Sequence, residues 1–213
     1  MDDAQIFDAI ADERRALADV LDGLDDAQWA TQSLCGEWDV RGVAAHLLAP
    51  TVTGIPEIVW LVLRARGDFE KSNVALTARV VRRYGHELPQ MLRDNAHHRF
   101  TPPGTGPIAP LTDLLIHGQD IRRPLRIERS VDADRRRAAL DFLNSPKSRR
   151  GFAPLTVPVR WVAEDVDWSS GPDDGRPTVS GPAEAVMLSL TRRAVAVDDL
   201  SGDGVDVVRA ALR

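Results

Sequence analysis

The sequence predicts a mainly α-helical protein, in which an antiparallel helix bundle is followed by a small α+β domain. Two observations carry this prediction. Up to residue 146, alanine, leucine and arginine dominate, and apolar residues recur at helical spacing. From residue 151 to 213, short runs rich in valine, tryptophan, threonine, glycine and proline alternate in the manner of strands. The predicted domains are therefore 1–146 and 151–213, joined by a linker that contains proline and serine.

The helices of the bundle are predicted from their apolar stripes and caps. The first should run from Asp3 to Leu24. Asp39 can cap the second, because its carboxylate can accept a backbone N–H of the first turn, and Pro50 should end or displace that helix. Further helices are expected over residues 56–66, 73–95 with a break at the glycine in position 85, from about 111, and 133–143. Short connections between them favour antiparallel neighbours.

The second domain should combine strands and helices. Apolar side chains alternate from Leu155 to Trp161, as in a strand, and residues 177–180 look like a shorter one. A helix is expected over 182–191, where a proline stands in the first turn, and another over 205–212. Residues 193–200 are ambiguous.

Composition narrows the classes of function. The 213 residues carry a net charge of -5 with a pI near 5.5, which gives no general reason to expect nucleic-acid binding. Cys35 is the single cysteine, so no intrachain disulfide can form and a reducing compartment is expected. The first residues are acidic rather than signal-like, and the apolar run around 58–63 is too short to span a bilayer. We therefore expect a cytoplasmic monomer or homodimer with no membrane or nucleic-acid partner.

Three side chains from two predicted helices could hold a metal ion. Asp113 and His117 are four residues apart, so on a helix they share one face, beside the apolar stripe. His46 lies similarly beside the stripe of its own helix. Two imidazoles and a carboxylate suit Zn²⁺, Fe²⁺, Ni²⁺ or Mn²⁺, and three protein ligands leave a position open for water or a substrate. Asp120, one turn past His117, could fix the tautomer of that histidine.

The same residue types also have plainer interpretations. An aspartate–histidine pair at this spacing is often a surface pair without metal. Cys35 is expected to be a small buried thiol, and Trp38 a core anchor rather than a stacking platform. The other histidines and the arginine clusters are expected in solvent or at helix ends: His86, His97, His98, Arg64/Arg66, Arg82/Arg83 and Arg122/Arg123.

The segment CGEWDVRGVAAHLL, residues 35–48, resembles the signature of the mycothiol-dependent maleylpyruvate isomerase family, part of the DinB-like metal-binding superfamily. In that signature a tryptophan, an N-cap residue and V-R-D-V or similar precede A-H-L, whose histidine is the first metal ligand. Trp38 and His46 match, and Gly42 stands where aspartate is common. The resemblance implies a DinB-like antiparallel four-helix bundle with His46 on the metal.

Two further motifs follow in the order of the family. The family motif Glu-x-x-x-His corresponds here to Asp113 and His117, and the following Gly-x-Asp corresponds to GQD, which ends at Asp120. The side chain of Asp113 is therefore one methylene shorter than the family glutamate. Family members often end in a small sterol-carrier-like α+β domain with L-x-G-R and then L-x-G-D-G. Here residues 190–193 read LTRR and residues 200–204 read LSGDG. The resemblance implies a role in activity for Arg193, while Arg192 replaces the family glycine.

The resemblance implies an enzyme, while the sequence leaves other classes open. A divalent metal, zinc in the first instance, held by His46, Asp113 and His117 would bind mycothiol as thiolate, which attacks a small electrophilic substrate. Arg193 would hold a carboxylate of that substrate, and isomerisation or S-transfer would result. One alternative is a non-catalytic metal- or ligand-binding or regulatory module. Another is a metal-dependent hydrolase, for which Asp120 is the only obvious general base.

Overall fold

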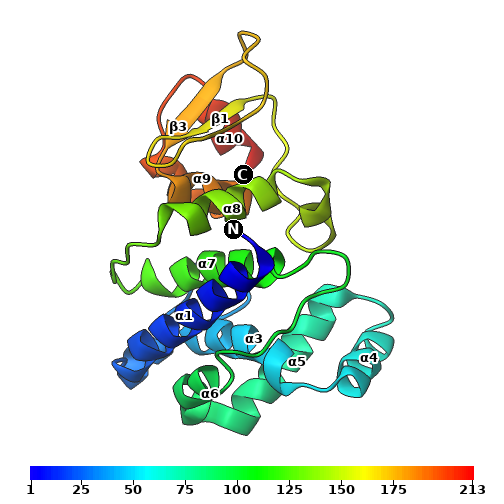
Figure 1. Ribbon diagram of the computed structural model, residues 1–213. Helices are drawn as coiled ribbons and strands as arrows, with labels where there is room; N and C mark the ends of the chain where they lie inside the picture. Colours follow the sequence, from blue (N-terminus) through cyan, green and yellow to red (C-terminus); the bar gives the residue numbers. More distant parts are fainter. The chain divides into compact units, whose positions relative to one another are not determined.

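The computed structural model describes residues 1–213, apart from the side chains of Phe69 and Arg150. The described chain is mainly helical, as predicted, and it contains one three-stranded sheet (Figure 1). It divides into two compact units that interleave along the sequence. The helical unit comprises residues 7–100 and 113–128, and the mixed unit comprises residues 1–6, 101–112 and 129–213. No described helix is both long and apolar enough to cross a lipid bilayer.

The helical unit is built from the first seven α-helices. These are, from residue 7, α1 (Asp3–Asp22), then α2 (Asp26–Trp29), α3 (Val40–Val52), α4 (Ile55–Arg64), α5 (Phe69–Tyr84), α6 (Leu88–Asp94) and, from residue 113, α7 (Ile108–Arg122), with a 3₁₀ turn at Gly85–Glu87. Helix α3 packs against α5 and α6, and α5 also contacts α4. The expected antiparallel four-helix arrangement stays a prediction.

Helix α3 lies in the core of this unit because it is apolar on nearly every side. Eight of its 13 residues are buried, which is typical of an internal helix. The helix starts as predicted, since the Asp39 carboxylate accepts the Gly42 N–H at 2.7 Å. Pro50 does not end it, and the helix continues to Val52. Because proline has no N–H, the His46 carbonyl lacks its usual helical donor at this position.

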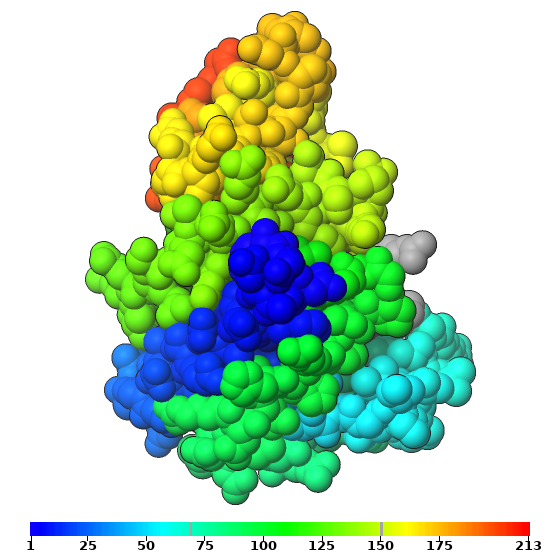
Figure 2. All heavy atoms as spheres, viewed as in Figure 1, coloured from blue at the N-terminus to red at the C-terminus, as the bar shows by residue number. Residues whose placement is uncertain are grey.

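Helix α4 differs from α3 in keeping its apolar face in solvent. The segment that contains it lies at the surface (cyan in Figure 2). Ile55 and Leu63 are 78% and 73% exposed. The Trp60 ring is partly covered by the Arg64 and Arg79 guanidinium groups, 5.3 and 4.8 Å from its centre. Cation–π contacts of this kind shield an exposed indole without burying it.

The mixed unit places helices against a small sheet. Its elements are α8 (Ala133–Leu143), a 3₁₀ turn at Pro146–Arg150, β1 (Arg160–Ala163), β2 (Trp168–Ser170), β3 (Thr178–Gly181), α9 (Ala183–Leu190), a 3₁₀ turn at Ala194–Asp199 and α10 (Val205–Ala211). The strand order is β2-β1-β3, with β1 antiparallel to β2 and parallel to β3. Helix α9 packs on β1 and β3, and α8 packs on α9.

Several element boundaries differ from the prediction for identifiable reasons. The strand expected at 155–161 begins only at Arg160, because Pro154 and Pro158 cannot donate to a sheet ladder. Leu155 instead donates its N–H to the carbonyl that ends α9, at Leu190. The strand β2 and the one-turn helix α2 were not predicted, since segments of three or four residues are too short to show a period. The domain division between residues 146 and 151 stays a prediction.

Candidate metal centre

The candidate centre joins one side chain of α3 to two of α7. His46 lies in the second turn of α3, and its side chain is 15% exposed. Asp113 and His117 stack four residues apart on α7, with side chains that are 32% and 11% exposed. One potential ligand atom from each of the three residues lies within 4.8 Å of the others. The structure therefore brings together the three residues that the sequence singled out.

The separations of these atoms fit a shared ion better than direct hydrogen bonds. The Asp113 carboxylate has one oxygen 3.6 Å from His46 Nε2 and the other 3.5 Å from His117 Nε2. These distances exceed the usual 2.7–3.2 Å of a hydrogen bond. Ligands about 2.1 Å from a tetrahedral ion are separated by roughly 3.4 Å, the edge of the tetrahedron. A nitrogen–nitrogen–oxygen donor set at this spacing therefore fits a divalent metal such as zinc, and the one-methylene shorter Asp113 still reaches both histidines.

The carboxylate of Asp120 contacts the second ring nitrogen of His117. His117 Nδ1 lies 2.8 Å from Asp120 Oδ2, and the Asp120 residue is fully buried. A carboxylate hydrogen-bonded to the far ring nitrogen fixes the tautomer, so that Nε2 presents its lone pair. The backbone carbonyl of Asp120 also accepts the Leu34 N–H at 3.1 Å, which ties the loop before α3 to α7.

Trp38 packs on the centre, where the sequence suggested a core anchor. Its ring stacks on His46 with centres 4.7 Å apart and planes 23° apart. The residue is only partly buried. A Cβ at Gly42 would lie 2.7 Å from the Cβ of Trp38, so only glycine admits the indole here. The spacing of Trp38, Gly42 and His46, four residues each, was the signal in the sequence that could have revealed this stack.

A second donor group overlaps the first. The Cys35 thiol lies within 4.8 Å of ligand atoms of His117 and Asp120, and the cysteine is partly rather than fully buried. In this second group, Asp120 Oδ2 already lies 2.8 Å from His117 Nδ1, so the carboxylate is engaged with the imidazole. The group of His46, Asp113 and His117 keeps that contact, so it is the better donor set.

Arg122 is another departure from expectation. It was predicted on a solvated face, but it is 2% exposed. Its Nη1 would lie 2.6 Å from a Cβ placed on Gly118, so the guanidinium crosses the helix directly over this glycine. His86, His97 and His98 are exposed, as expected, and His97 contacts Arg15.

Arg193 belongs to the mixed unit, just after α9. Its Nη1 donates to the Thr191 carbonyl at 2.7 Å. Arg192, where the family has glycine, keeps a glycine-like backbone with φ of 70°. Glycine adopts this left-handed region far more readily than arginine does.

Comparisons with known proteins give one family model and two solved structures that are similar to this chain. Residues 10–99 match the family model described as the mycothiol maleylpyruvate isomerase N-terminal domain. A crystal structure of the mycothiol-dependent maleylpyruvate isomerase is 14% identical, covers 95% of this chain and 93% of its own, and has a TM-score of 0.49. A histidine-to-alanine mutant of that isomerase is 12% identical, with the same coverage and a TM-score of 0.48. A search of curated proteins finds no match.

The family model covers the loop before α3 and the whole of that helix, with Trp38, Gly42 and His46. These residues lie in the segment 35–48, which carries the family signature. Residues 10–99 of this chain are therefore similar to mycothiol maleylpyruvate isomerase N-terminal domains.

Proposed function

We propose that this chain is a metal-dependent enzyme that uses a low-molecular-weight thiol of the mycothiol type. It would isomerise or conjugate a small electrophilic substrate that bears a carboxylate. The observation that carries the proposal is the convergence of His46, Asp113 and His117 at metal-ligand spacing. The name of the matched family supplies the thiol and the isomerase chemistry.

Zinc is the metal that we propose, because two imidazoles and one carboxylate form a common catalytic zinc set with an open position. When bound, the metal would keep a thiol ionised at neutral pH and polarise a substrate carbonyl. Two neighbouring residues orient the histidine ligands. Asp120 holds the proton on His117 Nδ1, and Trp38 holds the plane of the His46 ring.

The reaction needs a nucleophile that can add and leave again. A thiolate adds to an electrophilic carbon of a cis double bond, which leaves a single bond that can rotate. Expulsion of the same thiolate restores the double bond in the trans form. If the adduct instead takes up a proton and is released, the product is a thioether conjugate. Arg193 is proposed to hold the substrate carboxylate by a charge-assisted pair.

The alternative functions have less support. A metal-dependent hydrolase would need a general base, but Asp120 Oδ2 is already engaged by His117 at 2.8 Å. A non-catalytic module was suggested by the short Asp113 carboxylate and by the arginine at position 192. Asp113 reaches both histidines, and Arg192 keeps the glycine-like backbone. Neither departure therefore argues against catalysis.

The proposal is tested by comparing His46→Ala with His86→Ala. Both variants lose one imidazole, but His86 is exposed and belongs to none of the described donor groups. Elemental analysis should find about one divalent metal per chain in the wild type and in His86→Ala, and much less in His46→Ala. Turnover of maleylpyruvate with added mycothiol should follow the metal content.

Two results would contradict the proposal. Thiol-dependent turnover that survives in His46→Ala would exclude a role of this histidine in the reaction. A fully metal-loaded wild type that neither isomerises nor conjugates any of a panel of electrophilic acids would favour the non-catalytic module.

A further inference from the structure

The mixed unit contains a cavity of about 580 Å³ that no part of the proposed reaction uses. It lies among the end of α8, the 3₁₀ turn after it, the loop before β1 and the end of α9. Leu155, Trp161, Trp168 and Leu190 contribute apolar lining, and each is at most 7% exposed. A volume of this size holds a small organic molecule, and an apolar lining with a few polar groups is usual for such sites.

The edge of this cavity is cationic. Arg149, Arg176 and Arg192 line it, and none of the described lining residues is acidic. Arg176 is already neutralised, because Asp174 accepts two hydrogen bonds from its guanidinium and the pKa of Asp174 falls to about 2. Among the described residues, Arg149 and Arg192 have no ion-pair partner. This unpaired positive charge contrasts with the net negative charge of residues 151–213, which hold 6 basic and 10 acidic side chains.

Arg192 has an unusual backbone for an arginine. Its φ of 70° lies in the left-handed region, which costs a residue with a Cβ about 1 kcal/mol or more relative to glycine. The chain thus carries a strained cation at the edge of the cavity in a position where glycine would relieve the strain. Backbone strain of this kind is found mostly at functional sites, such as active sites and ligand-binding sites.

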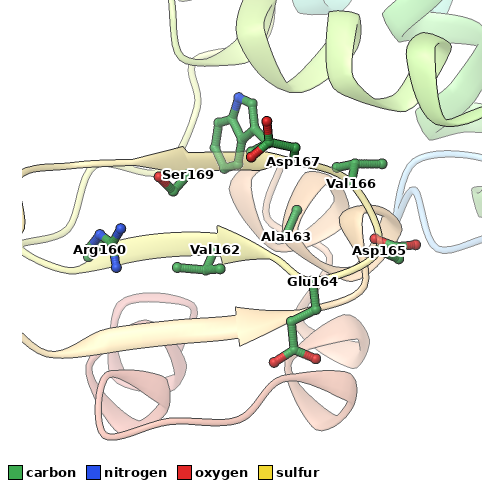
Figure 3. A pocket seen from close by; sticks show the side chains of 9 residues that line it. Arg160, Val162, Ala163, Glu164, Asp165, Val166, Asp167 and Ser169 are labelled. Carbon is green, nitrogen blue, oxygen red and sulfur yellow. The ribbon is translucent and has the colours of Figure 1, made fainter.

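Another hollow in the same unit lacks these features. It lies over the hairpin of β1 and β2, and its volume is about 670 Å³. Its carboxylates Glu164, Asp165 and Asp167 point in different directions (Figure 3). Asp165 pairs with Arg136, and Asp167 lies 3.5 Å from Arg137. No group of polar side chains converges there among the described residues.

We propose that the cavity beside Arg192 binds a small carboxylic acid with a flat or branched apolar body. The apolar part would lie against Trp161 and Leu190, and the carboxylate would pair with Arg192 and Arg149 at the edge. Burial of the apolar part supplies most of the affinity, and the charged pair selects the anion over a neutral analogue. This site does not depend on the proposed metal or on the thiol reaction.

The experiment is calorimetric titration with 2-naphthoate and with its neutral analogue 2-naphthamide. EDTA is present throughout, so that binding through a metal is excluded. Arg192→Gly removes the cation and relieves the left-handed strain, so this variant should fold at least as well as the wild type. Arg149→Gln removes the second cation, and Arg213→Gly is the matched control, because this exposed arginine is outside the cavity lining.

The wild type and Arg213→Gly should bind 2-naphthoate more tightly than 2-naphthamide. Arg192→Gly should weaken 2-naphthoate binding by at least about tenfold and leave 2-naphthamide binding unchanged. Arg149→Gln should act in the same direction. Equal affinity for acid and amide in the wild type, equal 2-naphthoate binding in Arg192→Gly and Arg213→Gly, or no binding at millimolar concentration would each overturn the proposal.

Discussion

Individual residues around the candidate metal centre are held by contacts that allow little variation. Gly42 is the clearest case, because Trp38 occupies the space that any Cβ would need. The indole packing links the capping turn of α3 directly to the orientation of His46.

Gly42→Ala should therefore disturb the metal centre without touching a ligand. The indole must shift, and overpacking of this kind typically costs about 1–3 kcal/mol. With the stack on His46 disturbed, metal affinity should fall about tenfold, within the range seen when a supporting group is lost. Competition with a chromophoric chelator measures this change. Gly36→Ala is the control, since a Cβ there has open space; equal affinity in both variants would remove the support for the stack.

The two overlapping donor groups give a second prediction at this scale. Cys35 is near His117 and Asp120 but contributes nothing to the group of His46, Asp113 and His117. Cys35→Ser should therefore keep its metal content, whereas Asp113→Ala should lose it. Elemental analysis of both variants decides between the groups. Loss of metal in Cys35→Ser with retention in Asp113→Ala would assign the metal to the thiol group instead.

The sequence predicted the ligand candidates better than their surroundings. The spacing of Asp113 and His117 was visible as a local helical period, and the motif around His46 was visible through its resemblance to a family signature. The burial of Arg122 was not visible, because it depends on the guanidinium crossing over Gly118. Trp38 was assigned to the core because a tryptophan is usually more buried than this one.

Among the secondary-structure elements, α1 and α6 are joined by one buried charge. The Arg14 guanidinium donates from Nη1 to the carbonyls of Asn95, Ala96 and His98, at 3.1, 3.0 and 2.8 Å. These carbonyls follow the end of α6, where a cation also favours the helix dipole. Burial lowers the pKa of Arg14 to about 10, which still leaves it charged at neutral pH.

Replacing this arginine should destabilise the helical unit. Arg14→Met fills the apolar part of the space but leaves buried carbonyls without their donor, at a cost of about 2–3 kcal/mol. For a chain of this size the Tm should fall by roughly 5–10 °C in a thermal melt followed by circular dichroism. The exposed neighbour Arg15→Met should change stability by less than about 0.5 kcal/mol. Equal effects of both substitutions would show that the three carbonyl contacts contribute nothing.

Long elements with a repeating apolar pattern were predicted more accurately than short ones. Helix α8 was predicted with the correct limits, because its apolar residues repeat over three turns. The 3₁₀ turn at Ala194–Asp199 was left ambiguous, since such short turns have no amphipathic period of their own. The start of α7 at Ile108 was missed by three residues because the prolines before and inside its first turn suggested a loop.

At the scale of the whole chain, sequence distance did not predict which segments pack together. Residues 113–128 belong to the unit formed by residues 7–100, while residues 101–112 between them belong to the other unit. Periodicity shows which face of a helix is buried but not which helix covers it. The predicted bundle of residues 1–146 placed these segments in one domain, but only the metal hypothesis required His46 to meet Asp113 and His117.

This pairing predicts that metal and folding are linked. The proposed ligands come from segments 67 residues apart, so the unfolded chain offers no preformed site and the ion should bind almost only to the folded state. At a free metal concentration 100 times Kd, such binding adds about 2.7 kcal/mol to the free energy of unfolding. The Tm of EDTA-treated protein should therefore rise by roughly 5–10 °C when zinc is restored. Asp113→Ala should melt at one temperature with or without zinc; a rise in its Tm equal to that of the wild type would place the ion elsewhere in the chain.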